Sequence, residues 1–253
     1  MTTRDPLNFR EQVIRLRLSW HGPLVWVAHL DRMRAVERAL RRARWPLAYS
    51  QGYNPRPQIV FALPSGVGIA SDAEYIDVSL EKKISPPEAA GALQEMLPAG
   101  IELREAAEIP LTAAKKLMGS VRAADYRFEH PGIAAYFEKI LACEDLSVMK
   151  FSKKKEKSVN IRPLIWGSRI LSEDAVRLRT AAGSRQNLRP DLVLDALHKY
   201  GGDEAYLNSK ITKEELWILP KKKAGYLTCP MEAADLQPGQ APDPSRILPW
   251  DEA

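Results

Sequence analysis

Arginine dominates residues 30–44, which hold six arginines against one aspartate and one glutamate. Apolar residues at 30, 33, 36, 40 and 43 recur every three or four positions, which predicts a helix with one buried stripe. The opposite face would carry arginines, whose planar guanidinium groups can each bind two oxygens of a phosphate. The alternative is a solvated face, partly paired through Glu37. The expected phosphate contacts are Arg34, Arg38, Arg41 and Arg42.

The connection that follows, residues 49–57, combines aromatic, polar and proline residues in one short loop. Tyr49 and Tyr53 could stack on unpaired bases. Asn54 could bind a base edge, and Arg56 could hold a phosphate. A basic helix that leads into such a loop is typical of proteins that bind RNA. The alternative is a proline-stiffened connection that only holds the next strand in register.

His29 and Asp31 stand at the expected start of the basic helix. A histidine there could deprotonate a ribose 2′-hydroxyl while arginines stabilise the developing charge, which would cut RNA without a metal. Alternatively, Asp31 caps the helix or pairs with an arginine, and His29 forms a hydrogen bond in the turn. A second basic site is expected where Arg185 and Arg189 precede another helix, because a helix N-terminus favours anions.

Composition narrows the class of protein. The 253 residues carry 45% apolar and 27% charged side chains, which is typical of a globular protein. Cys143 and Cys229 are the only cysteines, so zinc and iron–sulfur spacings are absent, and we expect no metal and no cofactor. No apolar run is long enough to cross a bilayer, and the first residues do not resemble a secretory signal. We therefore expect a cytoplasmic protein without membrane contacts.

Hydrophobic periodicity predicts the order of strands and helices. The first half follows the order βαββαβ, with strands at 13–18, 58–63, 75–80 and 101–105 and helices at about 30–44 and 86–96. The second half has a similar order with one strand more. We expect an α+β protein of two tandem ferredoxin-like (βαββαβ) units at residues 1–110 and 111–220. Residues 221–253 are expected to form an extended tail.

Several motifs of the first half resemble a known family. They are Ala28-His29-Leu30-Asp31, the helix at 37–43, the loop at 52–57 and the segment at 97–101. By these motifs the chain resembles DUF2344, a family of unknown function found fused to, or encoded beside, radical-SAM enzymes. The family usually has a serine where Ala28 stands. Residues 159–164 and 183–190 resemble it more loosely, and Arg162 joins the expected RNA contacts.

These observations favour an RNA-binding accessory protein. It would present tRNA, rRNA or a precursor RNA to a partner enzyme, and the resemblance implies a radical-SAM enzyme as that partner. The chain is not expected to be the radical-SAM enzyme itself, since it lacks the cysteines that hold the cluster. Two alternatives stay open: an endoribonuclease or RNA-modifying enzyme that uses His29 without a metal, and an adaptor that binds a protein and no RNA.

Overall fold

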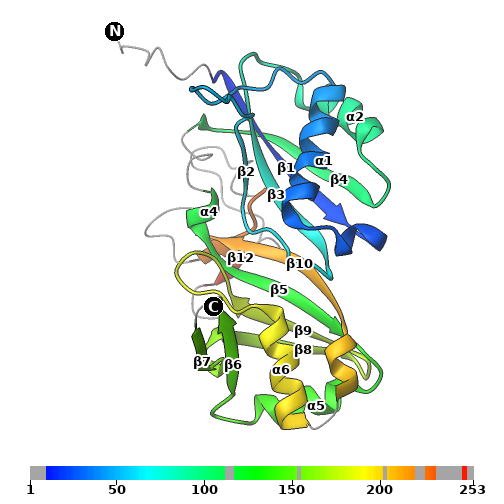
Figure 1. Ribbon diagram of the computed structural model, residues 1–253, viewed down its shortest axis with the longest axis vertical. Helices are drawn as coiled ribbons and strands as arrows, with labels where there is room; N and C mark the ends of the chain where they lie inside the picture. Colours follow the sequence, from blue (N-terminus) through cyan, green and yellow to red (C-terminus); the bar gives the residue numbers. More distant parts are fainter. Residues whose placement is uncertain are drawn as a thin grey trace.

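Two groups of strands and helices make up the molecule, and both contribute to one long sheet (Figure 1). The structure is a computed structural model that describes residues 10–111, 117–152, 155–201, 204–219, 226–231 and 247–249. Helices pack on the sheet in two pairs. They are α1 (His29–Arg42) and α2 (Pro86–Met96) over the first group, and α5 (Ile133–Leu141) and α6 (Pro190–Gly201) over the second.

Strand β1 (Gln12–Trp20) lies at the centre of the first group. Its antiparallel neighbours are β3 (Ile69–Leu80) and β4 (Ile101–Ile109), and the short strand β2 (Ile59–Phe61) pairs antiparallel with β3. The 3-10 helix η1 (Gly22–Trp26) precedes α1. Alternate residues of the strands face the helices, as the two-residue period of a strand requires.

Strand β5 lies at the centre of the second group, antiparallel to both of its neighbours. The elements of this group are α4 (Leu117–Ser120), β5 (Val121–Glu129), η2 (Arg162–Leu164), β8 (Ile165–Ser172), β9 (Ala175–Ala181), η3 (Glu204–Asn208) and β10 (Lys210–Ile218). A separate hairpin consists of β6 (Ser147–Ser152) and β7 (Lys155–Asn160).

A parallel pairing between β3 and β10 joins the two groups. Residues 69–71 of β3 lie beside residues 211–213 of β10, and the result is one mixed ten-stranded sheet with the central order β4-β1-β3-β10-β5-β9-β8. The prediction of two tandem ferredoxin-like units is therefore wrong. The two groups form one sheet because β10 provides hydrogen-bond partners for the backbone groups at the edge of β3, which would be unpaired in a separate unit. No local sequence pattern reports such a distant pairing.

The helix-facing side of the sheet buries two apolar clusters, one under each pair of helices. In the first, Val36 and Leu40 of α1 are fully buried against the sheet. The buried stripe predicted for α1 is wrong at its beginning, because Leu30 is exposed and Arg32 is buried instead. Arg32 turns inward because its guanidinium donates to the carbonyls of Ser65 and Gly66 in the connection at 62–68.

The described parts of the C-terminal tail pack on the opposite side of the sheet. They contain β11 (Tyr226–Thr228), which pairs with β10, and β12 (Ile247–Pro249), which pairs with β11. Leu227 is fully buried, and the carbonyl of Pro230 accepts a hydrogen bond from Arg15 at 2.9 Å. The remaining residues of the predicted tail lie outside the described ranges. Across the described residues, none of the helices is long and apolar enough to span a membrane.

Candidate nucleic-acid interface

Helix α1 presents most of its arginines to solvent. Val36 and Leu40 fix the helix on the sheet, which leaves Arg34, Arg38 and Arg41 exposed on its outer side. Arg34 pairs with Asp31 at 3.0 Å, and Arg41 pairs with Glu37 at 2.7 Å. Exposed pairs of this kind contribute only about 0.3–0.5 kcal/mol, so a phosphate can replace the carboxylate at little cost. Arg38 has no ion-pair partner within the part of the chain that the structure describes.

Arg42 differs from the other three predicted arginines. Its guanidinium donates to the backbone carbonyl of Met96, the last residue of α2. This contact ties the end of α1 to the end of α2. Arg42 therefore has a structural role, although its side chain remains exposed.

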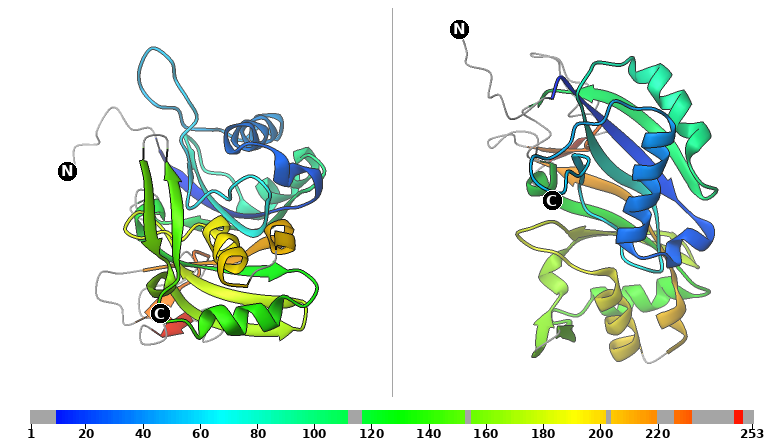
Figure 2. Two further views of the ribbon diagram at one scale, coloured as in Figure 1. Left: turned by 60° about the horizontal axis from the view of Figure 1, so that its bottom comes forward. Right: turned by 45° about the horizontal axis from the view of Figure 1, so that its top comes forward.

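The connection from α1 to β2 projects from the body of the molecule (Figure 2, left panel). Its base is closed by an isolated bridge between Tyr49 and Pro57. The backbone of Ser50 donates to the carbonyl of Arg56 at 2.8 Å, and the backbone of Arg56 donates to the Ser50 hydroxyl at 3.0 Å. Tyr53 at the tip is fully exposed, at 105%. The loop is thus braced at its base and open at its tip.

Helix α1 and the projecting loop belong to one surface. The guanidinium of Arg41 lies 5.7 Å from the ring centre of Tyr49, a cation–π distance. Asn54 is exposed next to Tyr53 near the tip of the loop. Gly52 has a φ of 132°, a conformation that other residues rarely adopt, so glycine is required at this point of the loop. The structure therefore brings Arg41 of the helix next to Tyr49 of the loop.

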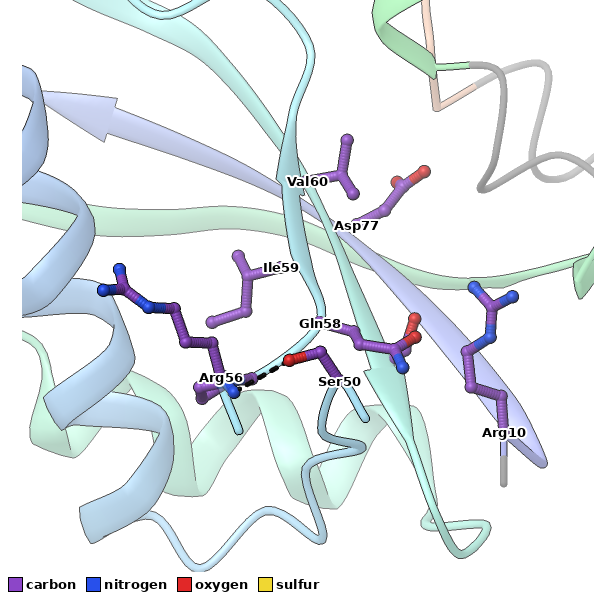
Figure 3. A pocket seen from close by; sticks show the side chains of 9 residues that line it. Arg10, Ser50, Arg56, Gln58, Ile59, Val60 and Asp77 are labelled. Atoms are coloured by element: carbon purple, nitrogen blue, oxygen red, sulfur yellow. Dashed lines mark hydrogen bonds between the residues drawn. The ribbon is translucent and has the colours of Figure 1, made fainter. Parts of the chain in front are cut away.

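A cavity of about 280 Å³ lies between the loop and the face of β3 that is turned away from α1. Figure 3 shows Arg56 and Arg10 on its two sides, with Ser50 and Gln58 between them. Neither guanidinium has an ion pair among the described residues. Asp77, which also lines the cavity, has its carboxylate bound by Arg15 at 2.6 and 2.9 Å. Figure 3 shows the two guanidinium groups pointing to opposite sides of the cavity, so they do not converge on one anion.

His29 and Asp31 do not form a catalytic pair in this structure. The His29 ring packs edge-on against Phe61, with ring centres 5.1 Å apart, and Asp31 is bound to Arg34. Burial lowers the pKa of His29 below its usual 6.5, Arg32 and Lys213 lower it further, and the charge of Glu74 opposes them. The imidazole is therefore neutral near pH 7. Its catalytic role stays a prediction.

The other three predicted arginines lie in the second group of strands. Arg162 is half-buried at the start of η2, and Arg185 is exposed. Arg189 is bound to Asp191 at the N-terminus of α6. None of the three lines the cavity between Arg10 and Arg56. The structure therefore does not bring the two predicted basic sites together in this cavity.

The sequence interpretation missed two features of the surface and its support. Arg10 lies outside every predicted element, and only the structure places it across the cavity from Arg56. Beneath α1, the buried Lys213 binds Glu74 at 2.7 Å across the junction of β3 and β10. Glu74 lies among apolar residues on the helix-facing side of its strand. A buried carboxylate that needs a cation as its partner could therefore have been predicted there.

Comparisons with known proteins give a family but no activity. No curated protein matches the chain. A solved structure described as "Crystal Structure of an Unknown Protein from Galdieria sulphuraria" is 11% identical, covers 80% of this chain and 97% of its own, and has a TM-score of 0.24. So low a score supports no argument about the fold. Residues 14–190 match the family described as "Uncharacterized protein conserved in bacteria (DUF2344)". The resemblance seen in the sequence is confirmed, and the chain belongs to the DUF2344 family.

Proposed function

We propose that the protein binds unpaired RNA through a surface that we call the arginine interface, formed by Arg34, Arg38, Arg41, Tyr53 and Arg56. The observation that carries the proposal is the fully exposed Tyr53 on a loop that is braced at its base. An aromatic ring held in solvent beside several cations suits stacking on a base whose phosphates are bound by arginine.

Unpaired RNA suits this surface better than a duplex. The bases of an A-form helix are stacked and paired, so a projecting tyrosine would find no free base face. In a loop or single strand the bases can splay apart and stack on Tyr53, while Arg38 and Arg41 hold the backbone. The spacing of three residues places these two arginines on the same side of α1.

The role would be that of an accessory protein. Within the described residues, His29 has no hydrogen-bond partner, and the acid and base whose charges act on it, Glu74 and Lys213, are paired with each other, which favours binding over cleavage. The bound RNA would be tRNA, rRNA or a precursor. The family resemblance suggests that the protein presents it to a radical-SAM enzyme, and pull-down of such an enzyme in the presence and absence of RNA would test this step.

Fluorescence anisotropy with a short single-stranded RNA tests the binding step. The double variant Arg38→Ala/Arg41→Ala should weaken binding and reduce the salt dependence, by a slope of about 0.7 for each phosphate that the variant no longer binds. Tyr53→Ala should weaken binding by about 1–3 kcal/mol and leave the salt dependence unchanged, because it removes stacking and no charge.

Arg169→Ala is the matched control, since Arg169 is also exposed but lies on β8 in the second group. It should leave both the affinity and the salt slope unchanged. Equal affinity of the wild-type protein and the Arg38→Ala/Arg41→Ala variant would refute the proposal. Loss of binding in the Arg169→Ala variant would show that the arginines act only through overall charge.

One observation favours a second candidate, a metal-independent ribonuclease. The lowered pKa of His29 keeps its imidazole neutral, as a general base must be. Incubation of the protein with labelled RNA in the presence of a chelator distinguishes the two functions. Cleavage that the His29→Ala variant abolishes would favour the ribonuclease, and intact RNA after prolonged incubation would favour the accessory role.

A further inference from the structure

A second cavity, of about 460 Å³, lies where the two groups of strands meet. One wall is the connection before β3, and the other is the N-terminus of α6. Its volume falls within the range of small-molecule sites, roughly 300–1,000 Å³. None of its lining residues belongs to the arginine interface. They are Leu63, Pro64, Gly66, Val67, Ile69, Tyr126, Asn187, Arg189, Pro190 and Asp191.

Tyr126 gives this cavity a polar group without a partner. The side chain comes from β5 and is only 6% exposed, yet it lines the cavity. Its hydroxyl makes no hydrogen bond to any of the described residues. The hydroxyl oxygen is not fully buried, so it is accessible from the cavity, where a ligand that accepts its hydrogen bond would replace water. Burial, and then the charge of Glu74, raises the pKa of Tyr126, so the hydroxyl remains a donor.

The residues behind the first wall carry an excess of positive charge. Arg32 and Lys213 are both buried, and Glu74 is the carboxylate placed between them. Lys213 and the backbone of Ser65 both donate to the same oxygen of Glu74, at 2.7 and 3.2 Å. Glu215 also acts on Lys213, but its carboxylate is bound to Arg17 at 3.1 Å.

Arg32 extends this charge toward the cavity. One of its terminal nitrogens donates to the carbonyls of Ser65 and Gly66, and Gly66 lines the cavity. The other, Nη1, is buried without a hydrogen-bond partner in the described part of the chain. Two cations thus share one carboxylate in a region of low dielectric, where an uncompensated charge acts over a longer distance than in water.

The second wall does not add to the positive charge. The N-terminus of α6, a helix of 12 residues, carries a partial positive charge, but Pro190 has no N–H group and the N–H of Leu192 donates to the carbonyl of Arg189. The side chain of Arg189 pairs with Asp191, and the charge of Asp195 also acts on it, so the preference for an anion comes from Arg32 and Lys213 behind the first wall. The remaining lining is mainly aliphatic, with Leu63, Val67 and Ile69 on one side.

We propose that this cavity binds a small molecule with an apolar body and one anionic group. The apolar body would lie against the aliphatic wall, and the anionic group would accept a hydrogen bond from Tyr126. Carboxylate and phosphate share the chemistry that the cavity recognises. The site is independent of RNA binding, because the two surfaces have no residue in common.

Three aromatic probes of similar size test the proposal by isothermal titration calorimetry: benzoate, phenyl phosphate and the neutral benzyl alcohol. At least one of the anions should bind roughly tenfold or more tightly than benzyl alcohol, as expected for a charge-assisted hydrogen bond. The stronger of the two anions identifies the ligand class. If neither anion binds, or if benzyl alcohol binds equally well, the proposal fails.

Tyr126→Phe removes only the hydroxyl, and that hydroxyl has no partner to lose. The variant should fold normally, bind the preferred anion roughly tenfold more weakly and bind benzyl alcohol unchanged. Tyr136→Phe, on α5 and outside the cavity, is the matched control and should leave the affinity for the anions and for benzyl alcohol unchanged. Unchanged anion affinity in Tyr126→Phe overturns the assignment of the hydroxyl.

Val67→Trp provides an independent test, since Val67 is largely exposed and a larger side chain can fill the cavity from its rim. This variant should lose all three probes while it retains the RNA affinity of the wild-type protein. Retained anion binding in Val67→Trp would place the anion elsewhere and overturn the proposal.

Discussion

Lys213 and Glu74 form a buried ion pair, and we expect removal of each partner to destabilise the protein by a different amount. Lys213 is fully buried and Glu74 is 3% exposed, and their charged atoms lie 2.7 Å apart. Removal of one partner from a buried pair costs about 3–5 kcal/mol, because the other charge stays in the interior without compensation. The two removals are not equivalent, because Glu74 also interacts with the charge of Arg32.

Glu74→Gln should be the more damaging change. It leaves two buried cations without their carboxylate, so we expect a loss of about 5 kcal/mol in the free energy of unfolding. Lys213→Met leaves Glu74 with Arg32 and the hydrogen bonds of Ser65, so we expect a loss of about 3 kcal/mol. For a chain of this size the corresponding decreases in Tm are roughly 10–20 °C and 6–12 °C.

The dependence on pH checks the cause of this difference. Burial lowers the pKa of Lys213 below 10.5, and Glu74 opposes that shift, so the pKa falls further in Glu74→Gln. Between the folded pKa and 10.5 the unfolded chain binds more protons than the folded one, so stability rises with pH in this window. The stability deficit of Glu74→Gln relative to the wild-type protein should therefore shrink between pH 7 and pH 10.5.

Urea denaturation followed by tryptophan fluorescence measures these differences. Glu102→Gln is the matched control, because Glu102 forms an exposed pair with Arg104 and its loss should cost less than about 1 kcal/mol. The reasoning is refuted if Lys213→Met is the more damaging variant, or if the deficit of Glu74→Gln grows as the pH rises.

Two further predictions concern the backbone and the contact between the helices. Gly183→Ala should destabilise the fold by about 2 kcal/mol or more, because its φ is 112° and an added Cβ would lie 2.5 Å from the carbonyl oxygen of Val121. Its control, Gly91→Ala in α2, has open space around the added methyl group and should gain about 0.5–1 kcal/mol; equal thermal shifts of the two variants would contradict this. Trp45→Phe should lose about 1 kcal/mol in urea denaturation, because the indole nitrogen donates to the carbonyl of Ala89 at 3.2 Å. An unchanged midpoint would show that this bond contributes nothing to the packing of α1 and α2.

Local elements were predictable because their patterns are local. The alternation at 13–18 corresponds to β1, and the helix at 86–96 has the predicted bounds. The strand predicted at 75–80 is longer, because β3 begins at Ile69. Small and polar residues such as Ser71 interrupt the apolar pattern in the first part of β3, which pairs with β10. A pairing over such a distance in the sequence leaves no periodic trace.

The same distinction between local and distant residues holds for the candidate site. The exposed arginines of α1 and the exposed Tyr53 follow from helical spacing and from turn-forming residues. Arg10 and Tyr126 could not be found, because the cavities that they line form only when distant segments meet. The burial of Arg32 was not predicted, because an exposed arginine, Arg34, stands only two residues away in the sequence.

The late position of β10 in the chain has a consequence for folding. During synthesis β3 emerges long before residues 211–213, which later pair with its edge. Until then the backbone groups of residues 69–71 stay open to other chains, and an unpaired strand edge is a template for aggregation. Contacts between residues so far apart in the sequence also slow folding. A nascent chain that stalls before β10 would therefore expose both the unpaired edge of β3 and the carboxylate of Glu74 without its partner Lys213. Such a chain would be a substrate for chaperones or proteases.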